Sequence, residues 1–135
     1  MNFTALILLL LSTFAPRSPE PELHLLVTNI QRGKGSISVA VFQDQEHFFK
    51  VPLVSKTVRA TADSLSFSVP LAPGTYAVAV YQDLNDNGKL DRGWFGIPTE
   101  PYGLSLNYRP TFSKPTFDDC KFAFSKPLWM TIYLK

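Results

Sequence analysis

Alternation of apolar residues with small or polar ones is the feature that most restricts the fold of this chain. The segments SISVAVFQ (36–43), SLSFSVP (64–70) and TYAVAVYQ (75–82) carry apolar side chains at every second position. Successive side chains of a β-strand point to opposite faces of a sheet, so these segments are predicted strands with one buried face. Segments that lack Pro and Gly show no strong helical period over twelve or more residues. The chain is therefore predicted to be all-β.

Weaker strand patterns complete the prediction. LHLLVTNI (23–30) is rich in branched residues, and SKTVRA (55–60) is a polar strand expected at a sheet edge. CKFAF (120–124) and LWMTIYL (128–134) close the chain. Seven to eight short strands separated by turns predict an antiparallel β-sandwich, of a transthyretin-like or immunoglobulin-like Greek-key kind. We expect one such domain over residues 23–135.

Turn residues predict how two pairs of strands are joined. RGKG follows the first strand and contains two glycines, which favours a hairpin between the strands at 23–30 and 36–43. LAPG precedes the strand at 75–82, and its Pro73 and Gly74 are typical turn formers.

The first 22 residues are predicted to precede the domain. Residues 1–15 contain an apolar run from Phe3 to Leu11, which is too short to span a bilayer and resembles the core of a signal peptide. A short membrane anchor or an uncleaved buried segment is the alternative, because no Lys or Arg precedes the run. Residues 16–22, PRSPEPE, are read as an extended linker. We expect export to the periplasm or the extracellular space, with no membrane span after processing.

Charge and cysteine content argue against nucleic-acid binding and against a disulfide-linked fold. The formal net charge is +2 without a basic cluster, so a nucleic-acid partner is not expected. The single cysteine, Cys120, excludes an internal disulfide. It shares strand parity with Phe122 and Phe124 and is predicted to be a buried thiol.

Regular strand pattern is lost from residue 83 to residue 119, and oxygen-bearing residues alternate at the start of this segment. Gly88 stands where an EF-hand-type calcium loop makes its sharp bend. Positions 1, 3, 5, 7 and 9 of such a loop fall on Asp83, Asn85, Asn87, Lys89 and Asp91. Lys89 would contribute its backbone carbonyl. Trp94 stands where the last carboxylate belongs, and Glu100 is the nearest substitute.

Two interpretations of this loop remain open. Calcium takes six to eight hard oxygen ligands, which matches the alternation. The alternative is a metal-free polar turn, because Asn and Gly both tolerate positive φ. Long irregular segments in compact domains are uncommon and often functional, whichever interpretation holds.

Aromatic residues follow the loop and suggest a ligand-binding surface. Exposed rings would stack on sugars or anchor a peptide or an envelope protein, and an arginine would bind an acidic group. The candidate binding residues are Trp94, Phe95, Tyr102, Tyr108 and Arg109. The alternative is that these rings form the core of the loop itself, in a metal-independent structural sandwich.

Catalysis is not expected from this sequence. The remote alternative is a hydrolase that uses Glu100 with Asp118 or Asp119. Adjacent carboxylates on a strand point to opposite faces and make poor partners for paired acid–base chemistry.

Three longer segments carry a family resemblance. AVYQDLNDNGKLD, GIPTEPYGLS and PTFDDCKFAF resemble the secreted bacterial family known as domain of unknown function 2141, with matches from Leu23 to Leu134. Cys120 stands where that family has Ala. The resemblance implies an exported all-β domain in which Glu100 belongs to a shared motif, and it supplies no function.

A shorter segment, LAPGTYAVAV, is weakly similar to transthyretin-like and carboxypeptidase-regulatory-like modules, which are mostly non-catalytic. The sequence as a whole predicts an exported, non-catalytic binding or accessory domain of the cell envelope with a calcium-stabilised loop at 83–91.

Overall fold

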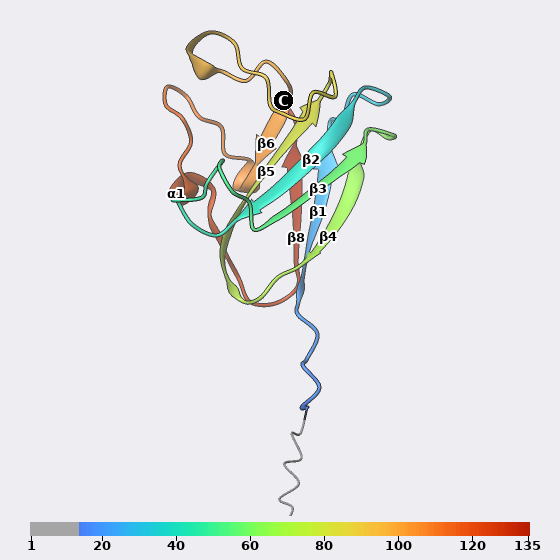
Figure 1. Ribbon diagram of the computed structural model, residues 1–135, viewed down its shortest axis with the longest axis vertical. Helices are drawn as coiled ribbons and strands as arrows, with labels where there is room; N and C mark the ends of the chain where they lie inside the picture. The colour runs from blue at the N-terminus through green and yellow to red at the C-terminus, as the bar shows by residue number, and fades with distance from the viewer. Residues whose placement is uncertain (1–13) are drawn as a thin grey trace, which may run out of the picture.

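Two β-sheets packed face to face form the protein (Figure 1). The computed structural model describes residues 14–135, so most of the predicted signal peptide at 1–15 lies outside the described residues. The strands are β1 (Glu22–Thr28), β2 (Ser36–Phe42), β3 (Val54–Arg59), β4 (Leu65–Pro70), β5 (Gly74–Asp83), β6 (Tyr102–Leu104), β7 (Phe122–Phe124) and β8 (Leu128–Tyr133). The helical segments are η1 (Trp94–Gly96), η2 (Ser105–Asn107) and α1 (Phe117–Cys120).

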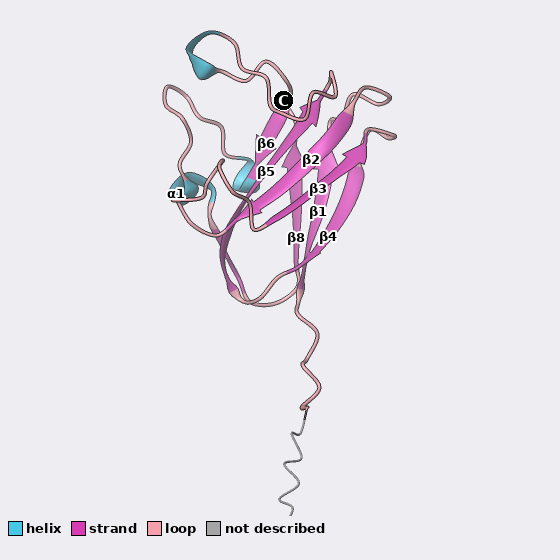
Figure 2. Cartoon of the chain, in the orientation of Figure 1, coloured by secondary structure: helices cyan, strands magenta, loops and turns pink. Residues whose placement is uncertain are grey.

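The strand order confirms the predicted sandwich. One sheet has the order β4-β1-β8, and the other has the order β3-β2-β5-β6 with β7 also paired to β5. The polar strand β3 lies at a sheet edge, as its sequence predicts. Figure 2 shows that strands dominate the structure and that the segment after β5 is mostly loop.

Two details of the predicted topology are wrong. The first two strands do not form a hairpin: β1 pairs with β4 and β8, whereas β2 pairs with β3 and β5. The turn between β1 and β2 crosses between sheets because buried Gln82 holds it, donating from Nε2 to the carbonyls of Gln31 and Lys34. The sandwich is also not wholly antiparallel, since β8 runs parallel to β1.

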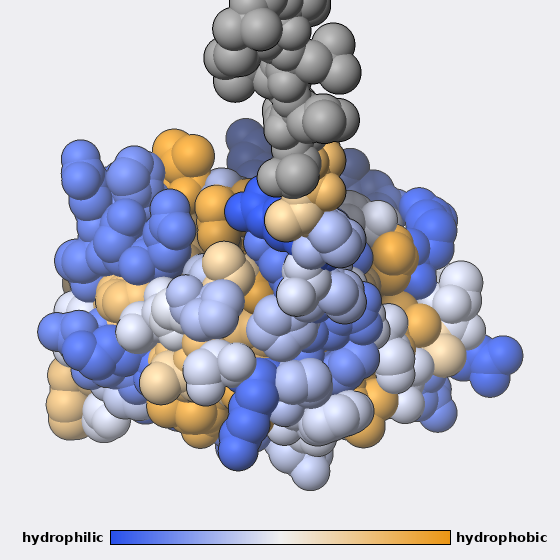
Figure 3. All heavy atoms as spheres, turned by 90° about the horizontal axis from the view of Figure 1, so that it is seen from below, coloured by the Kyte–Doolittle hydropathy of each residue, from blue (hydrophilic) through white to orange (hydrophobic). Residues whose placement is uncertain are grey.

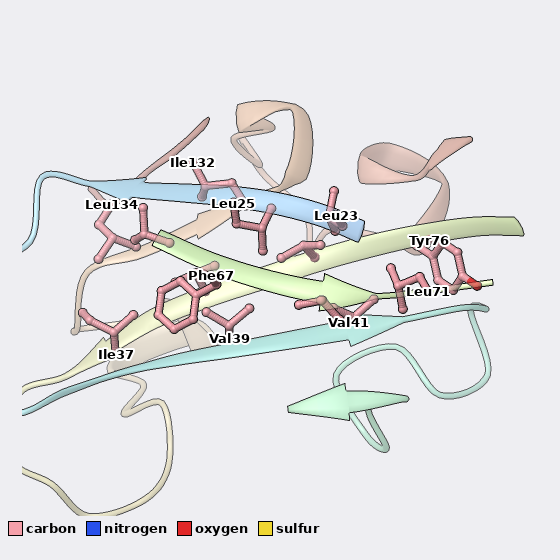
Figure 4. Close-up of a cluster of buried hydrophobic side chains, with 14 of the residues drawn as sticks. Leu23, Leu25, Ile37, Val39, Val41, Phe67, Leu71, Tyr76, Ile132 and Leu134 are labelled. Atoms are coloured by element: carbon pink, nitrogen blue, oxygen red, sulfur yellow. The ribbon is translucent and has the colours of Figure 1, made fainter. Parts of the chain in front are cut away.

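Alternating apolar residues fill the space between the sheets. Ile37, Val39 and Val41 of β2 are all buried and face Leu23 and Leu25 of β1 across the core (Figure 4). These are the positions that the period-two pattern selects. Each fully buried side chain of this kind contributes about 1.5–3 kcal/mol, so the shared core accounts for the pairing of the sheets.

A second apolar cluster covers the outer face of the larger sheet. Small residues Ala77 and Ala79 on β5 let the chain after residue 100 approach closely, and Phe117 of α1 packs there with Cys120. Burial raises the pKa of the Cys120 thiol to about 11, so the thiol is protonated at neutral pH. The cluster attaches the irregular segment at 83–119, called the excursion below, to the sheet.

The loop at 84–101 and the N-terminal segment lie at opposite ends of the sandwich. β5 ends beside the loop at 84–101, whereas β1 begins at the far end, where residues 14–21 leave the domain (Figure 1). Figure 3 shows that far end, where apolar side chains are interspersed with hydrophilic ones.

Gly103 provides a test of how β6 is seated. A Cβ atom at Gly103 would lie 2.6 Å from both Ile132 Cγ2 and the Tyr133 carbonyl oxygen, which leaves no room for a methyl group. We expect Gly103→Ala to lower the free energy of unfolding by about 1–3 kcal/mol, as overpacking does. Denaturant unfolding measures the change.

Gly93→Ala is the matched control. Its Cβ atom would meet Thr99 Cγ2 at 3.1 Å, which is the end of a side chain that can move. Equal losses of stability in the two variants would show that β6 is not confined by β8.

Candidate functional site

Buried Asp83, at the end of β5, organises the first turn of the loop. Its carboxylate oxygens accept hydrogen bonds from the backbone N–H groups of Asn87 at 3.2 Å and Gly88 at 2.7 Å. Gly88 has φ +80°, which only glycine adopts at little cost. The chain therefore curls around the Asp83 carboxylate.

Asp91 lies at the opposite side of this turn and joins the two asparagines. The side-chain Nδ2 groups of Asn85 and Asn87 donate to its two carboxylate oxygens at 2.7 and 2.6 Å. The Asn87 and Asn85 amides hold the pKa of the Asp91 carboxyl below its usual range. The polar side chains of the motif are thus brought together at one point.

Glu100 folds back beneath the loop and closes it. The side chain is only 6% exposed. Its Oε1 accepts from the N–H of Leu84 and its Oε2 from the N–H of Asp91, both at 3.0 Å. One buried carboxylate thereby joins the beginning and the end of the 84–91 segment.

The remaining acidic residue of the loop contacts two neighbouring strands. Asp86 accepts a hydrogen bond from Ser36 Oγ at 2.8 Å and pairs with Arg59 at 3.1 Å. These contacts fasten the loop to β2 and β3. Lys89 is exposed.

The donor set suits calcium chemically, but its oxygens already have hydrogen-bond partners. Over residues 14–135, no group of three or more His, Cys, Asp or Glu side chains is placed to hold a metal ion. Calcium binding here would therefore depend on the amide oxygens of Asn85 and Asn87 in addition to Asp83 and Asp91. The two Glu100 oxygens are engaged by backbone N–H groups.

A cleft of about 600 Å³ opens beside this loop. Its walls come from the segments 90–98 and 110–115, with further contacts from the chain after β2 and from β6. The lining residues are Phe49, Leu90, Arg92, Phe95, Gly96, Ile97, Pro98, Tyr102, Pro110, Thr111, Phe112, Ser113, Lys114 and Pro115. Volumes of 300–1,000 Å³ with mostly apolar walls are typical of ligand sites.

Two of the rings that line the cleft are almost fully exposed. Phe95 is 96% exposed and Phe112 is 99% exposed. Phe49 and Phe95 also have positive φ, of 60° and 59°, a conformation that bulky residues rarely adopt. Such backbone strain is concentrated at ligand sites in proteins.

The structure divides the predicted binding residues into separate groups. Phe95 and Tyr102 line the cleft, and Trp94 is 87% exposed at the adjoining loop tip. Tyr108 and Arg109 border a smaller hollow of about 160 Å³. The Arg109 guanidinium lies 4.4 Å from the Tyr102 ring centroid and donates to the carbonyls of Tyr102 and Lys135, so its role in the structure is to hold the end of the chain.

Several cleft residues escaped the sequence prediction. Phe49 follows β2 and lies far from the others in sequence, while Arg92 and Lys114 flank the aromatic positions. For Arg92 and Lys114, the only local signal in the sequence is a basic residue close to an aromatic one. For Phe49, the sequence offers no signal.

Comparison with protein families identifies the chain. The family model described as "Uncharacterized protein conserved in bacteria (DUF2141)" matches residues 25–129. The chain belongs to this family. Neither the curated proteins nor the solved structures gave a match.

The carboxylates of the hydrolase alternative have structural partners in this DUF2141 domain. Glu100 binds backbone N–H groups in the loop. Asp119 accepts from the Thr116 N–H in the capping box of α1, and Asp118 pairs with Lys121 at 2.9 Å. The structure gives each acidic group a local contact.

No helix within the described residues is both long and apolar enough to cross a bilayer.

Glu100→Gln tests the carboxylate that closes the loop. The substituted amide keeps one acceptor oxygen and leaves the N–H of Leu84 or of Asp91 without its partner. We expect the free energy of unfolding to fall by about 1–3 kcal/mol, the usual cost of an unsatisfied buried group. Denaturant unfolding gives the total, and hydrogen exchange of the two amides shows whether the loss is local.

Glu46→Gln serves as the control, because Glu46 is exposed. If the two variants unfold alike and the two amides stay protected, Glu100 does not hold the loop.

Proposed function

We propose that this domain is a non-catalytic binding module that takes its ligand in the cleft between segments 90–98 and 110–115. The observation that carries the proposal is the exposure of Phe95 and Phe112 on the walls of a cleft of about 600 Å³. Large apolar groups gathered at a concave site are typical of ligand recognition in monomeric domains.

Stability alone does not account for these aromatics. A phenylalanine left in water forgoes the roughly 1.5–3 kcal/mol that its burial would contribute. Phe95 adds the cost of a left-handed backbone, which is of order 1–3 kcal/mol. A ligand that covers these rings would recover the apolar burial that folding leaves unused.

The place of the cleft suits an accessory domain of the cell envelope. The N-terminal residues 14–21 leave the sandwich at the end away from the loop that forms one cleft wall (Figure 1). A tether at that end would leave the cleft facing outward. The short resemblance to transthyretin-like accessory modules agrees with this role, and a glycan, a peptide or an envelope protein remains the partner that the sequence predicts.

Truncating the exposed rings tests the binding site. We expect the neutral dye N-phenyl-1-naphthylamine to fluoresce on binding the parent protein, and Phe95→Ala and Phe112→Ala each to weaken binding at least fivefold. Removing a ring contact of 1–2 kcal/mol has about that effect. Both rings are exposed, so the melting temperature should change little.

Trp129→Ala is the matched control. Trp129 is 72% exposed on β8 and stacks on His24, outside the cleft. Equal binding by all three variants and the parent would refute the proposed site. Glycan and peptide arrays probed with the same proteins then separate the partner classes.

We propose, as a second candidate function, that the 83–91 loop binds calcium weakly. The supporting observation is that hydrogen bonds already draw Asp83, Asn85, Asn87 and Asp91 around one turn. These residues and the Lys89 carbonyl would hold the ion. The loop closes through its own hydrogen bonds, so calcium would stabilise it and would not be required for folding.

Calorimetric titration tests the calcium proposal. With an incomplete ligand set, the expected Kd is about 10⁻⁴–10⁻³ M. At ten times the Kd, calcium should raise the free energy of unfolding by about 1.4 kcal/mol. Asp91→Asn should abolish both the heat and the rise in melting temperature, whereas Asp118→Asn, which replaces an exposed carboxylate on α1, should not.

The absence of binding heat and of thermal stabilisation at several millimolar calcium would contradict the calcium proposal. The cleft proposal would stand, because it depends on other side chains.

A further inference from the structure

We propose that the cleft selects a small organic anion, in which a carboxylate, phosphate or sulfonate group is joined to an apolar or aromatic body. The inference rests on the proposed binding function and adds the chemical class of the ligand. Charge, donor placement and wall chemistry each support it.

The charge of the cleft has one sign. Arg92 lies on the wall formed by segment 90–98, and Lys114 lies on the wall formed by segment 110–115. Over the described range 14–135, no aspartate or glutamate lines the cleft. An anion between the two loops would meet a cation from each and no opposing carboxylate among the lining side chains.

Arg92 is held in place by its own loop. Its Nη1 donates to the Gly96 carbonyl at 2.9 Å, and the backbone of residue 92 bridges to that of Pro98. A guanidinium has five N–H donors in a planar fork, so most of them stay available after this contact. The fork matches the two oxygens of a carboxylate or the oxygens of a phosphate.

Lys114 supplies a second, more adaptable contact. Its ammonium lies 5.7 Å from the centroid of the Phe49 ring, which is within the range of a cation–π interaction. The ammonium has three donors on a flexible stem and accepts anions as a point charge. Phe49 thus contributes to the wall and orients the cation.

The apolar walls of the cleft determine the chemistry of the uncharged part of the ligand. Phe95, Ile97 and Phe112 would contact the ligand body, and prolines of both segments complete the surface. A neutral sugar would leave the charges of Arg92 and Lys114 without an anionic partner, so it would gain nothing from the charge-assisted contacts that an acid makes. The combination of two cations with apolar walls therefore favours an amphipathic acid over a neutral glycan.

A pair of dyes with one ring system tests the inference. 8-Anilinonaphthalene-1-sulfonate and N-phenyl-1-naphthylamine differ by the sulfonate group, and both fluoresce in apolar sites. In fluorescence titrations of the whole domain, we expect the sulfonate to bind about tenfold more tightly. Tenfold corresponds to about 1.4 kcal/mol, which is reasonable for one or two partly exposed charge contacts.

The variants assign the difference to the two cations. Arg92→Gln and Lys114→Gln should each reduce the affinity for the sulfonate severalfold and leave the neutral dye unchanged. Arg32→Gln and Lys126→Gln remove exposed cations elsewhere and should change neither. Raising sodium chloride to about 1 M, where the Debye length is about 3 Å, should narrow the gap between the dyes. Decanoate should displace the sulfonate dye, and decanol at equal concentration should displace it less.

The outcomes separate the two proposals. Equal affinity for the two dyes overturns the selection of anions and leaves the binding function in place. Failure of both dyes to bind overturns both proposals. Displacement by an acidic, aromatic peptide without displacement by decanoate would overturn the small-molecule ligand in favour of a peptide.

Discussion

The closure of the 84–91 loop by Glu100 is the contact on which the candidate site depends. The carboxylate lies beneath the loop, and its two oxygens bind N–H groups at both ends of the segment. A buried carboxylate that accepts two backbone hydrogen bonds replaces the polar contacts that water would otherwise provide. The hairpin-like segment that follows, with Arg92 and Phe95, starts from this fixed base. Without it, the end of the 84–91 segment, from which the 90–98 wall begins, would lose its hydrogen bond to a buried side chain.

The opposite wall depends on a comparable anchor. Asp119 caps α1 through the Thr116 N–H, and the Phe117 N–H donates to Gln45 Oε1 at 2.7 Å. Phe117 and Cys120 then bury α1 against the outer face of the larger sheet. Small alanines on β5 make this close approach feasible, because larger side chains there would hold the excursion away from the sheet. Segment 110–115 thus spans between η2 and a firmly seated helix.

The period-two pattern predicted strand faces well and strand partners poorly. Ile37, Val39 and Val41 are buried together as their spacing requires, and the polar strand β3 lies at an edge. Alternation says which side of a strand is apolar, but it does not say which strand lies alongside. The short glycine-containing turn after β1 therefore suggested a hairpin. In the structure this turn links strands of different sheets, and Gln82 holds it by hydrogen bonds to the carbonyls of Gln31 and Lys34. The parallel position of β8 is likewise set by contacts distant in sequence.

The candidate site likewise has one part that neighbouring residues in the sequence predict and another that depends on contacts between distant segments. The Asp and Asn spacing indicated a curled loop, and the structure brings Glu100 to it, because both features arise within a short stretch of chain. The cleft joins Phe49, Arg92 and Lys114 from separate segments, so no local pattern could assemble it. The aromatic residues after residue 93 are packed where they reach the outer face of the larger sheet and exposed where they do not. Tyr108 packs against the cluster on that face, whereas Phe95 and Phe112 lie on the cleft walls.

This division gives the excursion two physically distinct parts. Buried anchors such as Glu100 and Phe117 use hydrogen bonds and apolar contacts to hold the loops, and changes there act mainly on stability. The exposed residues between the anchors contribute little to the core, and changes there act mainly on what the cleft can contact. A rigid base with exposed tips limits the entropy lost when a ligand binds, because the loops are ordered beforehand. The strained backbone at Phe49 and Phe95 fits this arrangement, since only a well-anchored loop can keep an aromatic residue at positive φ.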